Sequence, residues 1–188
     1  MQLQELRPGL WRWTAAHPEW DHAQHWGPDV ASVYAELPDA IVIVDPLVPP
    51  DEEERFWAAL DRDVERAAKP VRILLTVSWH VRSAEAVAER YGAATDGSLP
   101  AGVEAHAATA GEETAYWLPA HGALVFGDAV LGADDGVRLC PESWLAGTLA
   151  ELKEELRPLL ELPVERLLVS HGEPVLQDGR AALARALA

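Results

Sequence analysis

The stretch Leu74–Ala93, LLTVSWHVRSAEAVAERYGA, joins an apolar run, a short polar segment and a helical pattern. The apolar run predicts the end of a strand. The pattern from Ala84 to Tyr91 predicts a helix, with Ser83 as its cap and Gly92 as its stop. A strand, a polar terminus and a helix in this order form a βα unit. The one histidine of the polar segment, His80, is therefore expected at a strand end.

Apolar and amphipathic segments elsewhere predict that strands and helices alternate along the chain. The predicted strands are Gly9–Trp13, Asp29–Leu37, Ala40–Val44, Val71–Val77, Val103–Thr109 and Thr114–Pro119, then a strand from Ala123 that ends at Gly127 and Asp128, and one from Val164 that ends in His171 and Gly172. The other predicted helices are Asp51–Ala68, a long amphipathic helix over Pro141–Leu160, and Asp178–Leu187.

The composition indicates an acidic protein with a substantial core. The chain has 188 residues, 49% of them hydrophobic, and we expect a single domain over residues 1–188. Lys and Arg total 15 against 31 Asp and Glu, which gives a formal charge of −16. This charge repels a phosphate backbone, so nucleic acid is not an expected partner. The same repulsion argues against docking on an anionic membrane surface.

The cysteine content and the start of the chain favour a cytoplasmic location. Cys140 is the only cysteine, so it can form no internal disulfide and no thiolate metal cluster. The first residues lack a basic start and an unbroken apolar core, and no apolar run reaches the ~18 residues of a membrane helix.

Polar groups follow three of the predicted apolar strands: His80, Asp128 and His171. In layered α/β sheets, strand ends are where distant parts of a chain bring reactive side chains together. We therefore expect these three side chains to converge, and they are the main functional signal in the sequence.

The order of the segments AIVIVDP, LLTVSWHVRSAE, ALVFGDAV and LLVSHGEPV resembles the metallo-β-lactamase superfamily over nearly the whole chain. The resemblance implies an α/β fold, a four-layer αββα sandwich. The central family motif, His-x-His-x-Asp-His, falls on Ser78–Ser83, where only His80 matches a functional position. The segment therefore occupies the place of a dinuclear metal-binding motif without its full ligand set.

Two later landmarks of the family are intact. Gly127–Asp128 matches the Gly-Asp that bridges the two metals in the family, and Ser170–Gly172 matches the closing histidine motif. The family's remaining histidine ligand falls on Thr109, with His106 three residues earlier. Asp45 matches an early aspartate that has a structural role near the site.

The resemblance leaves His80, Asp128 and His171 as candidate metal ligands. Two imidazoles and a carboxylate suit one divalent ion, zinc, iron or manganese, with open positions for water. The alternative is that no metal binds and the three residues are hydrogen-bonded remnants of an ancestral site.

Arg82 stands where the family has an aspartate, and it carries a permanent positive charge. A guanidinium repels a second cation, so a dinuclear site is not expected. We expect Arg82 to pair with Asp128 or Asp45, the alternative being exposure to solvent. With His80, Asp128 and His171 it completes the set of candidate catalytic residues.

The segment Thr14–Asp29 is rich in imidazole and indole rings and precedes a predicted strand. It either forms a lid that contacts a small ligand or completes a metal site, or packs on the surface. Together with Trp79, the candidate substrate-binding residues are Trp20, His22, His25 and Trp26. His121 is expected to be exposed, and Cys140 and Trp144 either line the site or pack the last helices.

Three functions remain open. The first is a metal-assisted hydrolase of a small ester, thioester or lactone, in which one ion activates water. The second is a metal-free relative that binds a small molecule or uses His80 or His171 in acid–base chemistry. The third is a partner-binding protein whose tryptophan-rich first third forms an oligomer surface. The sequence fixes neither the substrate nor the oligomeric state.

Overall fold

The computed structural model describes residues 1–23 and 26–188, and the chain divides into two compact units. The first unit comprises Met1–Leu75 and Trp79–Gly102, and the second comprises Thr76–Ser78 and Val103–Ala188. Each unit combines a β-sheet with two α-helices, and each is described by itself.

The first unit contains a five-stranded sheet in the order β1-β2-β3-β4-β5. Its strands are β1 (Gln2–Arg7), β2 (Leu10–Ala16), β3 (Asp29–Glu36), β4 (Ile41–Val44) and β5 (Val71–Leu74). Neighbouring strands are antiparallel except β4 and β5, which run parallel. Every residue of β4 is buried, as expected for a fully apolar strand.

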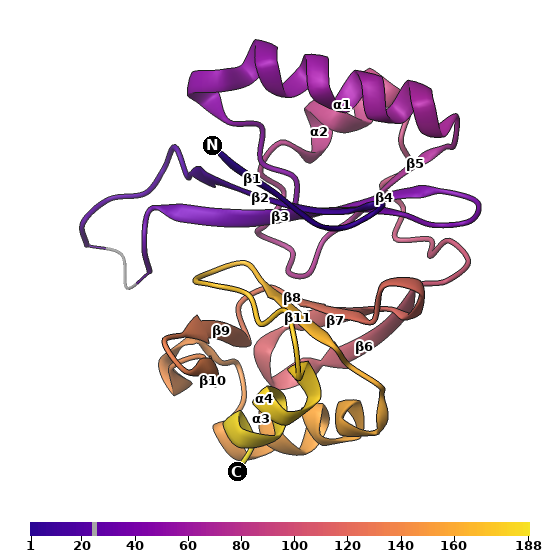
Figure 1. The fold of residues 1–188 in the computed structure, drawn as a ribbon. Helices are drawn as coiled ribbons and strands as arrows, with labels where there is room; N and C mark the ends of the chain where they lie inside the picture. The colour runs from indigo at the N-terminus through magenta and orange to yellow at the C-terminus, as the bar shows by residue number, and fades with distance from the viewer. Residues whose placement is uncertain (24–25) are drawn as a thin grey trace. The chain divides into compact units, whose positions relative to one another are not determined.

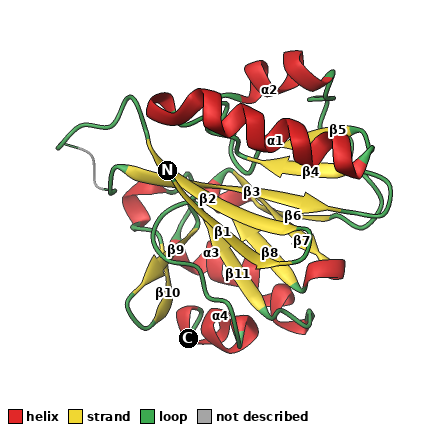
Figure 2. Cartoon of the chain, turned by 45° about the horizontal axis from the view of Figure 1, so that its top comes forward, coloured by secondary structure: helices red, strands yellow, loops and turns green. Residues whose placement is uncertain are grey.

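The helices of this unit, α1 (Glu53–Ala67) and α2 (Ala84–Tyr91), cover one face of the sheet (Figures 1 and 2). A 3₁₀ turn, η1 (Pro50–Glu52), precedes α1. Between helices and sheet lies an apolar cluster that includes Ile43, Phe56, Ile73 and Val87. Burial of these apolar side chains between helices and sheet therefore stabilises this unit.

The predicted bounds of α2 are confirmed. Gly92 ends the helix in the left-handed conformation, at φ 60°. Ser83 is the N-cap residue, but its side chain makes no cap bond, because its Oγ accepts the N–H of Val48 at 2.9 Å. The preceding strand is shorter than predicted and ends at Leu74, because the chain turns there toward the polar segment.

The second unit contains a four-stranded sheet in the order β11-β8-β7-β6 and a separate two-stranded ribbon, β9 with β10. The strands are β6 (Glu104–Ala108), β7 (Glu113–Leu118), β8 (Ala123–Phe126), β9 (Val130–Ala133), β10 (Gly136–Leu139) and β11 (Arg166–Val169). β8 and β11 are parallel, so their carboxyl ends lie at the same edge of the sheet.

Helices α3 (Leu149–Leu156) and α4 (Gly179–Ala186) pack with this sheet around a core that includes Phe126, Leu152, Leu167 and Leu183. Short 3₁₀ turns make the remaining connections: η2 (Thr109–Gly111), η3 (Pro119–His121), η4 (Glu142–Trp144) and η5 (Arg157–Glu161). Among the described residues, no helix is long and apolar enough to cross a membrane.

The predicted long helix over residues 141–160 is wrong in extent. The chain forms η4, then α3, then η5, because Thr148 starts a new helix with a capping box to Glu151. Before it, the N–H groups of Ala146 and Gly147 bond the carbonyl of Ala110 instead of continuing a helix. After it, Pro158 lies in the first turn of η5 and cannot donate a helical hydrogen bond.

Candidate functional site

His80 lies in the first unit, in the turn between β5 and α2, and is 6% exposed. Its Nδ1 lies 2.9 Å from Oδ2 of Asp45, which directly follows β4 and is also buried. A carboxylate at Nδ1 favours the tautomer in which Nδ1 carries the proton and Nε2 carries the lone pair. Both a metal-binding histidine and a histidine base use this arrangement.

The Asp45 turn is held by hydrogen bonds from the side chains of two other segments, at Ser32 and Arg82. Asp45 has a left-handed backbone, at φ 48°, and its carbonyl accepts bonds from Ser32 Oγ at 2.7 Å and Arg82 Nη1 at 3.0 Å. Ser32 Oγ in turn accepts the N–H of Leu47 at 3.0 Å. The carboxylate that orients His80 therefore sits on a backbone fixed on both sides.

Arg82 acts within this unit as a donor to main-chain oxygens. Its Nη1 bonds the carbonyls of Ala31 at 2.8 Å and Asp45 at 3.0 Å. The predicted contact with Asp45 is thus made to the backbone, while the Asp45 carboxylate faces His80. Arg82 also adopts a left-handed backbone, at φ 41°, so the guanidinium bonds stabilise a turn that an L-residue rarely forms.

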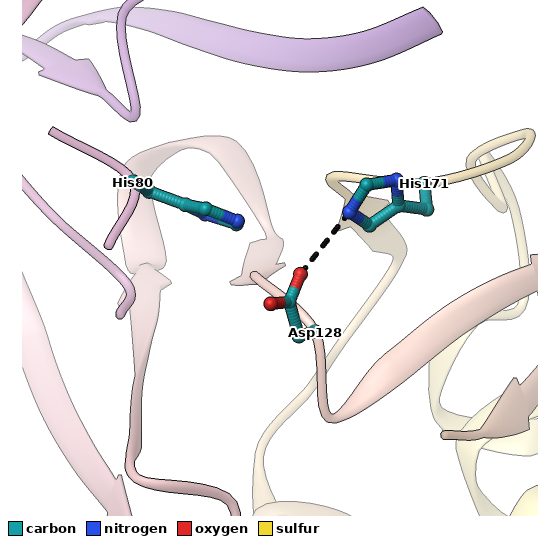
Figure 3. A group of neighbouring side chains, drawn as sticks. All are labelled: His80, Asp128 and His171. Atoms are coloured by element: carbon teal, nitrogen blue, oxygen red, sulfur yellow. Dashed lines mark ion pairs between the residues drawn. The ribbon is translucent and has the colours of Figure 1, made fainter. Parts of the chain in front are cut away.

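Asp128 and His171 lie together in the second unit. Asp128 follows β8 and His171 follows β11, and the two strands pair in parallel, with Phe126 opposite Val169. His171 Nε2 lies 3.2 Å from Asp128 Oδ1 (Figure 3). Parallel pairing therefore brings two polar side chains from distant parts of the sequence to one edge of the sheet.

The loop that carries Asp128 wraps around a buried carboxylate that the sequence analysis missed. Glu113, the first residue of β7, accepts the N–H groups of Gly127 at 2.8 Å, Asp128 at 2.7 Å and Ala129 at 2.6 Å. Burial raises the pKa of the Glu113 carboxyl to about 7, against the opposing effect of these three donors. The only signal in the sequence is an acidic residue at the start of an apolar strand.

Glycines allow the strand-end loops of this unit to approach closely. A Cβ on Gly132 would lie 2.4 Å from the backbone N and O of Glu173, and Gly132 N–H donates to the carbonyl of His171 at 2.8 Å. Gly172 has φ 82°, a conformation that favours glycine. The residues after His171 are therefore packed directly against β9.

The tryptophan-rich segment of the first unit forms its own ring contacts. Trp20 Nε1 donates to the carbonyl of Trp26 at 2.7 Å, and its ring meets that of His22 edge to face at 4.8 Å. Trp79 is 51% exposed. His25, also a predicted ligand contact, lies outside the described residues. A role for these residues in substrate binding stays a prediction.

The remaining residues that the sequence singled out lie in a strand, in 3₁₀ turns and in the core. His106 lies in β6 with Nε2 3.9 Å from the Glu104 carboxylate, and Thr109 starts η2. The prediction that His121 is exposed is wrong: the residue, at the end of η3 between β7 and β8 in the sequence, is only 5% exposed. Cys140 belongs to the core of the second unit, where burial raises the pKa of its thiol to about 11.

No protein-family model matches the chain, and no curated protein matches its sequence. Solved structures of metallo-β-lactamases do match it. One from Erythrobacter litoralis, with beta mercaptoethanol in its active site, has a TM-score of 0.64 and 17% identity, covering 98% of this chain and 93% of that one. FIM-1 from Pseudomonas aeruginosa, in its mono-zinc form, has a TM-score of 0.65 and 14% identity, covering 99% and 94%.

A third similar structure, a metallo-β-lactamase from Pontibacter korlensis, has a TM-score of 0.56 and 13% identity, covering 99% of this chain and 98% of that one. Similarity at these identities establishes the fold. The chain is an α/β protein with the metallo-β-lactamase fold, as its sequence resemblance implies.

Proposed function

We propose that this protein of metallo-β-lactamase fold hydrolyses a small ester, thioester or lactone with the help of a single divalent ion. The observation that carries the proposal is the contact between Asp128 and His171, 3.2 Å apart at the ends of two paired strands. These two residues match the landmarks of the family that remain intact in the sequence.

The donor chemistry fits such an ion. His80, Asp128 and His171 each offer one ligand atom, and together they supply two imidazoles and one carboxylate, a set that binds zinc or iron and leaves positions open. The hydrogen bond between Nδ1 of His80 and the Asp45 carboxylate leaves the lone pair on Nε2 available to bind an ion. Metal-binding histidines commonly have such a carboxylate at their other ring nitrogen. Among the similar structures, FIM-1 is a mono-zinc form, which provides a precedent for one ion in this fold.

A second ion is disfavoured by the residues at the family's other ligand positions. Arg82 stands where the family has an aspartate, and its charge is permanent. Two further ligand positions of the central motif are occupied by Ser78 and Ser83. Because a guanidinium repels a cation and a hydroxyl is a poor ligand for zinc, we propose at most one ion.

An ion held by these residues would polarise the substrate carbonyl and lower the pKa of water toward ~7. The chain's own residues hold the ligands in place. Asp45 fixes the ring of His80, and the Arg82 bonds fix the Asp45 backbone. We further propose that the indole rings of Trp20, Trp26 and Trp79, with His22, contact the apolar part of the substrate.

A second candidate function needs no metal, and the buried pair of His80 and Asp45 favours it. A histidine with Nδ1 on a carboxylate can accept a proton at Nε2, which is the role of a general base. In that case the protein binds a small molecule without an ion, and His80 activates water or a substrate hydroxyl directly.

Metal analysis of protein purified without a histidine tag separates the two candidates. We expect about one zinc, iron or manganese ion per chain, lost in both His80→Ala and His171→Ala. His106→Ala is the matched control, because its ring lies beside Glu104 in β6, and it should keep the ion. Metal-free wild-type protein that gains no thermal stability from added zinc, iron or manganese would overturn the metal proposal.

Hydrolysis then distinguishes the metal-free candidate. A panel of small esters, thioesters and lactones is assayed with and without a chelator. Chelator-sensitive turnover supports the ion-assisted hydrolase. Chelator-resistant turnover that is lost in Asp45→Asn supports His80 as a general base instead.

A further inference from the structure

Glu113 is a buried carboxylate that the proposed hydrolysis does not use. Its side chain is 3% exposed, and it accepts three consecutive backbone N–H groups, those of Gly127, Asp128 and Ala129, at 2.6–2.8 Å. A single carboxylate with three short N–H bonds fixes the direction of a loop far more than one bond would. The loop it fixes is the one that carries Asp128.

The fit of this loop around Glu113 leaves no spare room. A Cβ on Gly127 would lie 2.3 Å from Thr76 Oγ1 and 3.3 Å from Glu113 Oε2. Glycine therefore lets the backbone pass close to the Thr76 side chain, beside the carboxylate. The Asp128 side chain leaves the same loop and reaches His171 at 3.2 Å.

Glu113 also joins the segment that precedes His80 in the sequence. Its backbone forms an antiparallel bridge with Val77, and the N–H of its neighbour Thr114 donates to the carbonyl of Thr76 at 2.7 Å. His80 lies three residues after Val77 in the sequence. Glu113 thus contacts the Asp128 loop through its side chain and Val77 through its backbone.

We propose that Glu113 is the positioning residue of the metal site, setting the backbone of residues 127–129 so that Asp128 can act as a ligand. This inference rests on the proposed function, because it assigns Glu113 to the same site. The inference predicts that metal affinity depends on Glu113 although Glu113 does not contact the ion. Carboxylates that orient metal ligands in other proteins affect metal affinity in the same way.

The test compares Glu113→Gln and Glu113→Ala with the wild type. Gln keeps one oxygen acceptor but turns an amide group toward a donor, so it should weaken the loop less than Ala. Leu152→Ala is the control for lost stability, because Leu152 is fully buried in α3 of the same unit. Two quantities are measured: hydrogen exchange of the 127–129 amides in metal-free protein, and zinc affinity by chelator competition at a temperature where every variant is folded.

We expect the three amides to exchange at least tenfold faster in Glu113→Ala, with other amides of β8 less affected. Zinc binding should weaken by about 10- to 100-fold in Glu113→Ala, less in Glu113→Gln, and stay unchanged in Leu152→Ala. Unchanged zinc affinity in both Glu113 variants would overturn the inference, as would an equal loss in Leu152→Ala.

Failure of the proposed function gives a different result. If the wild type binds no zinc, the proposed metal site is wrong, and the exchange rates alone judge Glu113. Faster exchange confined to residues 127–129 then supports its positioning of the Asp128 loop, and unchanged exchange overturns it.

Discussion

Replacing the Glu113 carboxyl by an amide should change how the stability of the protein depends on pH. Burial raises the pKa of Glu113 from 4.5 to about 7 in the folded chain, against the three N–H donors of residues 127–129. The unfolded chain exposes this group to water, where its pKa returns to the ordinary value. Between these two pKa values the folded state therefore binds more protons than the unfolded state.

The sign and size of the effect follow from that difference. The free energy of unfolding falls as pH rises wherever the folded state binds more protons, so the contribution of Glu113 is present below pH ~4.5 and declines up to pH ~7. A shift from 4.5 to about 7 corresponds to about 3 kcal/mol, at 1.36 kcal/mol for each pKa unit. Glu113→Gln has no proton to release and lacks this decline.

The assay is urea unfolding of the wild type and Glu113→Gln between pH 4.5 and 8, with a chelator present so that no ion affects the carboxyl. The wild type should lose about 3 kcal/mol relative to the variant over this range. Glu112→Gln is the matched control, because the carboxylate of Glu112 is next to Glu113 in the sequence but exposed. Its free energy of unfolding should change with pH as that of the wild type does. A difference that stays constant, or that grows in favour of the wild type as pH rises, refutes the reasoning, since the N–H donors would then outweigh burial.

Three further outcomes follow from individual contacts. Arg82→Ala removes two charge-assisted bonds to main-chain carbonyls and should lower the free energy of unfolding by about 2 kcal/mol; a loss below ~0.5 kcal/mol would mean that these bonds do not hold the turn. Gly132→Ala should prevent normal folding, seen in circular dichroism, because its Cβ would lie 2.4 Å from the Glu173 backbone, whereas Gly27→Ala, with nothing within 4 Å, should leave the melting temperature unchanged. Cys140 should resist a thiol reagent at pH 8 until the protein is unfolded, because burial raises its pKa to about 11, and complete labelling of the native protein within minutes would contradict its burial.

Local patterns in the sequence predict much of the fold. The helix Ala84–Tyr91 was predicted at its true bounds, because a glycine in the left-handed conformation ends it and its apolar residues recur at helical spacing. The long helix predicted over residues 141–160 is wrong, because leucine spacing does not reveal that Ala110 takes the N–H groups of residues 146 and 147. The polar β1 strand was missed for a similar reason, since most of its residues are exposed and its pairing with β2 supplies its hydrogen bonds.

The sequence likewise predicts only part of the candidate site. Asp128 and His171 follow apolar strands, so their place at strand ends is readable from the sequence, and parallel pairing of β8 and β11 accounts for their contact. The role of Glu113 is not readable from the sequence, because its three partners are backbone N–H groups 14 to 16 residues away, and every residue except proline supplies such a group. The contact of Arg82 with the Asp45 carbonyl is hidden likewise, since charge alone favours a carboxylate partner.

The most direct test of the proposed site is the X-ray absorption spectrum of the zinc-loaded protein, which counts the imidazoles around the ion. If His80 and His171 bind one zinc, the wild type has two histidine nitrogens at ~2.0–2.1 Å from the ion. Each single alanine variant, which loses the ion on purification, shows one histidine nitrogen when it is loaded with excess zinc. Two imidazoles in the wild type that both persist in His80→Ala or in His171→Ala would contradict the proposal, as would a zinc ion bound without any histidine.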